Sequence, residues 1–176
     1  MNKFQLIQEL QSYQSAYFEE REFTSSFLEL LKSEEVFQRT HLPGHITGSS
    51  WIVNSDKTKV LLVHHAKLNR WLQPGGHADG DENVLRVALR EAEEETGLKR
   101  LIVMSQQIFD LDIHTIPTRK DFPQHLHYDI RYLIQANETE QIVVSEESHD
   151  VKWIALKDLE KYNDETSILR LKQKLF

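Results

Sequence analysis

Four glutamates crowd into five positions of the stretch REAEEETGL, residues 90–98. The pattern predicts a helix that ends at Gly97, because glycine often terminates a helix in the left-handed conformation. Negative charge near a helix C-terminus opposes the helix dipole, and like charges three or four positions apart cost about 0.2–0.5 kcal/mol per pair. The sequence therefore tolerates a local electrostatic cost, which either solvent or a bound cation must offset.

Three of these side chains, those of Glu91, Glu94 and Glu95, fall within one arc of the predicted helix, whereas Glu93 points to another side. Two interpretations are open. The face could be solvated surface, with Arg90 pairing to Glu94 four positions later, and these residues alone favour that reading. Alternatively, the three carboxylates form a hard-oxygen cluster suited to Mg²⁺ or Mn²⁺.

The longer segment LQPGGHADGDENVLRVALREAEEETGL, residues 72–98, resembles the Nudix box, G-x5-E-x7-R-E-U-x-E-E-x-G-U with U apolar. Nine constrained positions over 23 residues are all filled. They are Gly76, Glu82, Arg90, Glu91, Ala92, Glu94, Glu95, Gly97 and Leu98. So complete a match is specific, and it reverses the preference in favour of a metal site.

The Nudix resemblance implies hydrolysis of a nucleoside diphosphate linked to another group, with cleavage within the diphosphate. A divalent metal would neutralise the phosphate oxygens and lower the pKa of a bound water. The resemblance also implies that Arg90 and Glu82 form an ion pair that orients the loop and the helix. The implied ligands of Mg²⁺ or Mn²⁺ are the Gly76 carbonyl, Glu91, Glu94 and Glu95.

The base that activates water has two candidate positions. Glu91 is one of them, and in other Nudix relatives the base is a glutamate on a downstream loop. Here the stretch SEESHD, residues 145–150, offers Glu146 and Glu147. We favour Glu147, because the loop ends shortly after it at the predicted strand VKW; an exposed acidic loop is the alternative.

Polar side chains alternate along two predicted strands, so that each set lines one face. The first set is Asp110, Asp112 and His114, and the second is His125, His127, Asp129 and Arg131. The two faces could form the floor of a substrate pocket or face solvent; a transition-metal site of His125 and His127 is a weaker alternative. We therefore expect His114, His127 and Asp129 to contact the substrate. His77, directly after Gly76, either touches phosphate or is a spacer.

Apolar residues recur at helical spacing in residues 1–36, and this pattern predicts two helices that meet near residues 13–16. Their apolar faces would pack on the core or form a homodimer interface, with a substrate lid as the alternative. The stretch LPGHITGSS, residues 42–50, has the composition of a connection. We therefore predict an N-terminal helical segment over residues 1–42 and a Nudix hydrolase domain over residues 43–176.

The remaining elements follow from periodicity. Two strands flank a turn at residues 54–57, and a third lies at 70–73. Residues 74–76 have no regular structure, and a turn at 79–81 supplies an aspartate cap for a helix over 82–96. Strands are predicted at 101–116 and 124–136, followed by a strand and helix in 150–162 and a short terminal helix. This order is compatible with an α+β fold, and the Nudix resemblance specifies an α/β/α sandwich with a mixed sheet.

Composition limits the function classes. The chain has 39% apolar and 28% charged residues and a net charge of −7, which indicates a globular protein that avoids polyanionic nucleic acid and membrane surfaces. It has no cysteine, so disulfides and thiolate zinc sites are excluded. No signal-peptide pattern appears, and a cytoplasmic location is expected. Alternatives to a pyrophosphohydrolase are a non-catalytic Nudix-fold ligand-binding domain, a Nudix-fold isomerase and an mRNA-cap hydrolase, which should have a basic surface.

Overall fold

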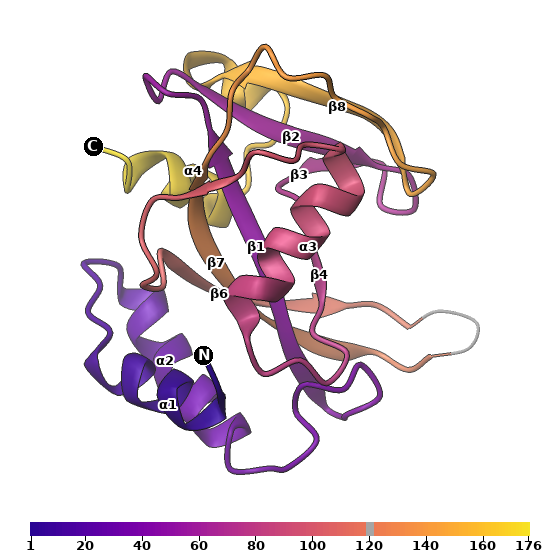
Figure 1. The fold of residues 1–176 in the computed structure, drawn as a ribbon. Helices are drawn as coiled ribbons and strands as arrows, with labels where there is room; N and C mark the ends of the chain where they lie inside the picture. Colours follow the sequence, from indigo (N-terminus) through magenta and orange to yellow (C-terminus); the bar gives the residue numbers. More distant parts are fainter. Residues whose placement is uncertain (119–121) are drawn as a thin grey trace.

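Helices cover both faces of one mixed sheet in the computed structural model, which describes residues 1–118 and 122–176 (Figure 1). The helices are α1 (Lys3–Ser12), α2 (Phe18–Leu30), α3 (Val84–Thr96), the 3₁₀ helix η1 (Leu156–Lys161) and α4 (Thr166–Gln173). The strands are β1 (Gly44–Val53), β2 (Lys59–His65), β3 (Arg70–Leu72), β4 (Gly75–His77), β5 (Ile102–Val103), β6 (Asp110–Ile116), β7 (His125–Gln135) and β8 (Ser148–Ala155). The predicted α/β/α sandwich with a mixed sheet, preceded by helices, is confirmed.

Strand β1 is the centre of the sheet. It pairs parallel with β7 along its whole length and antiparallel with β2 and β4, and all ten of its residues are buried. The predicted connection over residues 42–50 is therefore wrong. A Cβ atom on Gly48 would lie 2.8 Å from the Val84 carbonyl oxygen, and the Ser50 hydroxyl donates to the Ala88 carbonyl at 2.8 Å. The small residues let α3 approach the strand closely rather than marking a loop.

Opposite faces of β1 enter two separate cores. Ile46 and Ile52 pack in the larger core beneath α1, α2 and α3, whereas Trp51 and Val53 pack beneath η1 and α4. The alternation follows from the two-residue period of a strand. The carboxylate helix and the C-terminal helix therefore belong to different layers.

Several predicted boundaries change in the structure. The strand expected over residues 101–116 is two strands, β5 and β6, and residues 75–77 form β4 rather than an irregular loop. The helix after β8 is a 3₁₀ helix. The N-cap of α3 is Asn83, whose side chain accepts from the Arg86 amide, instead of an aspartate. Gly97 ends α3 with a φ of 73°, as predicted.

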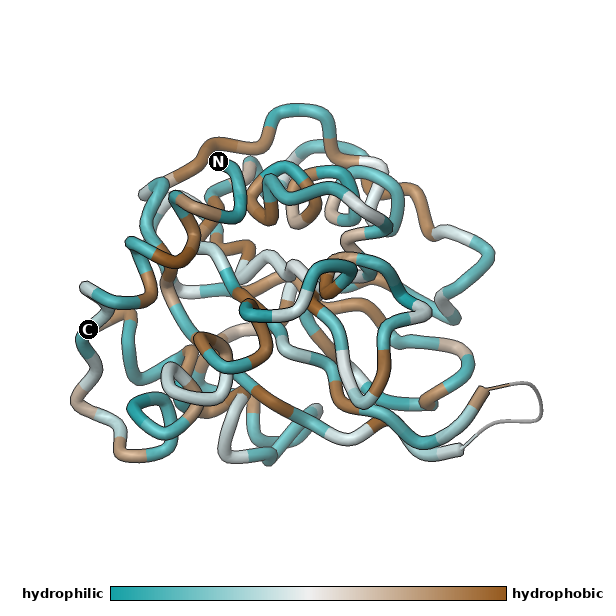
Figure 2. Tube along the Cα trace, turned by 90° about the horizontal axis from the view of Figure 1, so that it is seen from below, coloured by the Kyte–Doolittle hydropathy of each residue, from teal (hydrophilic) through white to brown (hydrophobic). Residues whose placement is uncertain are grey.

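The N-terminal helices share the core of the domain. Leu6, Leu10 and Phe27 are fully buried in the same cluster as residues of α3 and β7. Buried Glu20 of α2 accepts from the Leu111 amide of β6 at 2.9 Å and pairs with Lys174 at 2.5 Å. Figures 1 and 2 show both termini on the same side of the molecule, opposite the outer ends of β6 and β7. Apolar side chains of the first 36 residues therefore pack in the core, which is one of the three alternatives predicted for them.

Replacing Leu10 should show that α1 is part of the cooperative core. Leu10→Ala removes a fully buried side chain and should lower the free energy of unfolding by about 2–5 kcal/mol. Phe4→Ala is the matched control on the same helix, because Phe4 is 66% exposed, and it should change stability by less than about 0.5 kcal/mol. Urea unfolding of both variants measures the difference. Equal unfolding midpoints would mean that α1 does not contribute to the core.

None of the described helices, in residues 1–118 and 122–176, is both long enough and apolar enough to cross a bilayer.

Candidate active site

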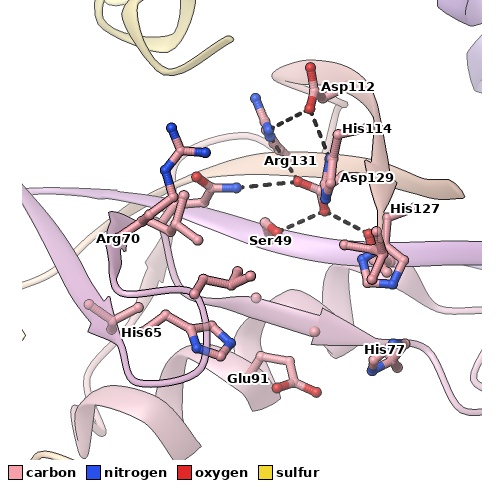
Figure 3. Close-up of a pocket in the computed structure, with 18 of the residues that line it drawn as sticks. Ser49, His65, Arg70, His77, Glu91, Asp112, His114, His127, Asp129 and Arg131 are labelled. Atoms are coloured by element: carbon pink, nitrogen blue, oxygen red, sulfur yellow. Dashed lines mark hydrogen bonds and ion pairs between the residues drawn. The ribbon is translucent and has the colours of Figure 1, made fainter. Parts of the chain in front are cut away.

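A cleft of about 1250 Å³ runs between the C-terminal turns of α3 and the polar face of the sheet. Figure 3 shows Glu91 on one side of this cleft and the bonded group of Asp112, Arg131 and Asp129 on the other. The cleft is lined by ten of the residues that the sequence assigned to the site, but not by Glu82 or Glu146. These residues are Gly76, His77, Arg90, Glu91, Glu94, Glu95, His114, His127, Asp129 and Glu147.

The three glutamates of the Nudix box line the cleft at different depths. Glu95 is only 7% exposed, Glu91 is half-buried, and the Glu94 side chain is 59% exposed. Glu93 lies outside the cleft, and its carboxylate is 3.5 Å from the Lys99 ammonium group. The separation of Glu93 from the other three follows the helical period that predicted it.

Burial makes the carboxylates of Glu91 and Glu95 costly to ionise. Desolvation raises the pKa of Glu95 to about 8. The hydrogen bond from the Gly75 amide lowers this pKa, whereas the negative charges of Glu91 and Glu147 raise it further. Desolvation also raises the pKa of Glu91. A divalent cation would remove this cost, because it favours the charged form of each carboxylate.

Gly76 gives an independent test of whether the residues fit a metal ion. A Cβ atom at this position would lie 2.5 Å from the Glu91 carboxyl carbon, so any side chain would displace that carboxylate. Only glycine lets the backbone approach the glutamate so closely. The oxygen-only donor set of Glu91, Glu94, Glu95 and the adjacent carbonyl suits Mg²⁺ or Mn²⁺.

Arg90 connects α3 to β4. Its guanidinium lies 2.8 Å from Glu91 and 3.4 Å from Glu94, and it donates to the His77 carbonyl at 2.8 Å. The predicted ion pair with Glu82 is wrong, because the Glu82 carboxylate accepts from the Lys3 amide in α1. Arg90 is therefore placed to hold the glycine-containing strand against the carboxylate helix.

The floor of the cleft is organised by Asp129 of β7. Its carboxylate accepts from the hydroxyl groups of Thr47 at 3.0 Å and Ser49 at 2.7 Å, and from Arg131 at 2.8 Å. The Gln73 amide adds a longer bond at 3.3 Å (Figure 3). Asp129 is thus bonded to four neighbours that it orients.

A buried charge network supports this floor. Arg131 also pairs with Asp110 and Asp112, and Arg170 of α4 donates to Asp110 at 2.8 and 3.0 Å. Desolvation opposes ionisation of Asp112, but the charge of Arg131 and the hydrogen bond with His114 lower the pKa of Asp112 to about 2. The alternating aspartates predicted from the sequence are therefore ionised partners of buried arginines.

Histidines gather at one end of the same floor. Desolvation, with the charge of Arg39, lowers the pKa of His77 to about 4, and desolvation with neighbouring imidazoles lowers that of His127 to about 2. His45 of β1 lies against both, with ring centroids 5.2 and 4.9 Å away. His45 was not predicted as a site residue, because it lies in residues 42–50, the stretch expected to be a connection. The alternation of His45, Thr47 and Ser49 was the signal that could have revealed it.

Glu147 lines the cleft, whereas Glu146 is not among the residues that line it. The charge of Glu147 also contributes to the raised pKa of Glu95, so the two carboxylates are within electrostatic reach. Arg39 and Arg70 line the cleft as well and were not predicted. No local pattern distinguishes these arginines from surface ones, because they enter the site from a loop and from a short strand.

Comparisons with known proteins identify the family to which the chain belongs. An m7GpppN-mRNA hydrolase of Xenopus laevis is 37% identical over 101 residues, which are 53% of this chain but only 34% of the frog protein. A probable DHNTP pyrophosphohydrolase of Lactococcus lactis is 28% identical over 124 residues, covering 69% of this chain and 74% of that protein. An Ap4A hydrolase structure from C. elegans, 20% identical, superimposes with a TM-score of 0.60 over 74% of this chain and 93% of that chain. The NUDIX domain family model matches residues 44–174, most of the sequence, and the chain therefore belongs to the NUDIX domain family.

Proposed function

We propose that this protein is a divalent-metal-dependent pyrophosphohydrolase that cleaves within the phosphate chain of a nucleotide or a related organic diphosphate. One observation carries the proposal. Glu91, Glu94 and Glu95 line the same large cleft, with Gly76 in close contact with Glu91. A non-catalytic binding domain of this fold would not need to retain the full carboxylate set.

The metal ion, when bound, would polarise the phosphate oxygens and make a water nucleophilic near neutral pH. Glu91, Glu94, Glu95 and the Gly76 carbonyl are the residues that would hold Mg²⁺ or Mn²⁺ there. Arg90 keeps Gly76 and Glu91 together through its bonds to the His77 carbonyl and to the Glu91 carboxylate. The site therefore depends on the packing of β4 against α3.

The chain's own polar groups divide the remaining tasks. Glu147 would accept the proton that water loses as its oxygen bonds to phosphorus, and the bond from phosphorus to the bridging oxygen breaks. Arg39 and Arg70, which line the cleft, would bind the phosphate oxygens. His77, His114 and His127 would contact the substrate along the floor. Charge stabilisation and alignment are the main requirements of phosphoryl transfer.

The relatives support a proposal for the substrate class. The names of the frog and Lactococcus proteins describe hydrolysis of an organic group that carries a phosphate chain. We infer that this chain also acts on a small-molecule substrate of that kind. A net charge of −7 favours a free nucleotide over the RNA of a capped message.

A substrate panel tests the proposal. Release of phosphate or of a nucleoside monophosphate should be followed with dinucleoside polyphosphates, nucleoside triphosphates, sugar nucleotides, ADP-ribose and capped RNA. We expect turnover of one small-molecule class in Mg²⁺ or Mn²⁺. Preferential decapping of RNA would favour the mRNA-cap alternative, and silence across the panel with metal bound would favour the binding-domain alternative.

A further inference from the structure

Three histidines from three strands meet at one end of the cleft floor. His45 of β1, His77 of β4 and His127 of β7 each offer a ring nitrogen, and these ligand atoms all lie within 4.8 Å of one another. The ring centroids of His77 and His127 are 4.9 Å apart, and Figure 3 shows these two side chains at the same end of the cleft. Strand pairing explains why these three positions are close together, but it does not explain why all three are histidines.

Strand pairing places the three side chains on one face. His45 is paired in register with His127, and Thr47, two residues after His45, is paired with His77. Residues directly opposite each other in a sheet project to the same side, and so do residues two apart along a strand. The backbone hydrogen bonds of β1, β4 and β7 therefore fix the cluster, which does not depend on mobile loops.

Nε2 of His45 is a buried atom without a hydrogen-bond partner among the residues that the structure describes. His45 is completely buried. Its Nδ1 atom lies 3.3 Å from the His41 carbonyl oxygen, which accepts the ring proton in one tautomer. That tautomer leaves a lone pair on Nε2. A buried polar atom without a partner is costly and calls for a ligand.

The chemistry of the donors identifies the ligand. Imidazole nitrogen suits Zn²⁺ and similar transition-metal ions, whereas Mg²⁺ requires oxygen. We propose that His45, His77 and His127 bind Zn²⁺ at a site separate from the carboxylates of α3. With the ion bound, His77 and His127 would be its ligands and would no longer contact the substrate directly. Zn–N bonds of about 2.0–2.1 Å require the three ring nitrogens to lie closer to one another than they do without the ion. The three side chains would therefore rotate toward the ion when it binds.

His125 adjoins the three-histidine cluster. Its ring stacks on His45 with centroids 5.0 Å apart, and its Nε2 atom lies 3.3 Å from Nε2 of His127. The Nδ1 atom of His125 lies 2.9 Å from the Pro123 carbonyl oxygen, which accepts the ring proton in the tautomer that leaves a lone pair on Nε2. Such an outer hydrogen bond is the usual support of a histidine ligand. A bound ion would therefore cross-link β1, β4 and β7 beside Gly76.

Calorimetric titration of the tag-free, EDTA-dialysed full chain with ZnCl₂ tests the site without any substrate. The wild type should bind one Zn²⁺ at the cluster, and His77→Asn should weaken its Kd by at least about 100-fold. His127→Asn should have the same effect. Because His77 and His127 are both only partly buried, the same loss in both variants is not explained by misfolding of one of them. His149→Asn is the matched control, because His149 is exposed and lies outside the cluster, and its Kd should stay within about two-fold.

Two results would overturn the proposal. One is tight Zn²⁺ binding that survives both His77→Asn and His127→Asn in variants whose melting temperatures in EDTA match the wild type. The other is Zn²⁺ binding that is lost in Glu94→Gln, which would assign the ion to the carboxylates. X-ray absorption of the Zn²⁺ complex should show the multiple-scattering pattern of imidazole ligands, and an oxygen-only shell would contradict the site. Hydrolytic activity enters none of these measurements, so failure here leaves the proposed function standing.

Discussion

Glu94→Gln should lower kcat for the best substrate by roughly 100- to 1000-fold, the loss typical when one charge-stabilising group is removed. The substitution keeps the size of the side chain and removes its negative charge. Because the Glu94 side chain is 59% exposed, the fold should be unaffected. Steady-state kinetics in saturating Mg²⁺ measure the effect, and circular dichroism confirms that the fold is retained.

The neighbouring position provides a matched control. Glu93→Gln makes the same chemical change one residue earlier, on a side chain that is 44% exposed and lies beside Lys99 outside the cleft. Its kcat should remain within about two-fold of the wild type, since surface changes away from a site have small effects. Equal activity of the two variants would remove Glu94 from the metal site.

Asp110→Ala should lower the free energy of unfolding by about 3–5 kcal/mol, because it leaves buried positive charges without a partner. Asp110 is fully buried and pairs with Arg131 at 3.2 Å, Arg170 at 2.8 Å and Lys174 at 2.9 Å. Those three residues come from β7 and from the C-terminal helical region. Urea unfolding at pH 7 would measure the loss.

An exposed ion pair shows how much of that effect depends on burial. Asp150 pairs with Lys152 on the surface of β8. Asp150→Ala should cost no more than about 1 kcal/mol, since surface ion pairs are screened by water and salt. If the Asp110 and Asp150 variants lost the same stability, the buried network would not be a determinant of the fold.

The sequence predicted helix α3 well, because its signals are local. Nine constrained positions place Glu91, Glu94 and Glu95 on one helix face, and Gly97 ends the helix with positive φ. Strand alternation also predicted that the polar residues of 110–114 and of 125–131 each line one face of their strand. These patterns depend only on the periods of 3.6 and 2 residues.

Interactions between distant segments could not be predicted in the same way. The stretch from Gly44 to Ser50 has the glycines and serines of a loop, yet it is the central strand, because α3 packs closely on Gly48. That error concealed His45. Likewise, Glu82 bonds to the Lys3 amide of α1 instead of Arg90, a contact across 79 positions that no local pattern reports.

Hydrolysis of the best substrate of the panel, measured in Mg²⁺, in EDTA and after Mg²⁺ is restored, tests the central claim most directly. The carboxylates of the cleft are predicted to support turnover in Mg²⁺, to lose it in EDTA and to regain it when Mg²⁺ is added back. Turnover that continues unchanged in EDTA would contradict a metal-dependent reaction at Glu91, Glu94 and Glu95.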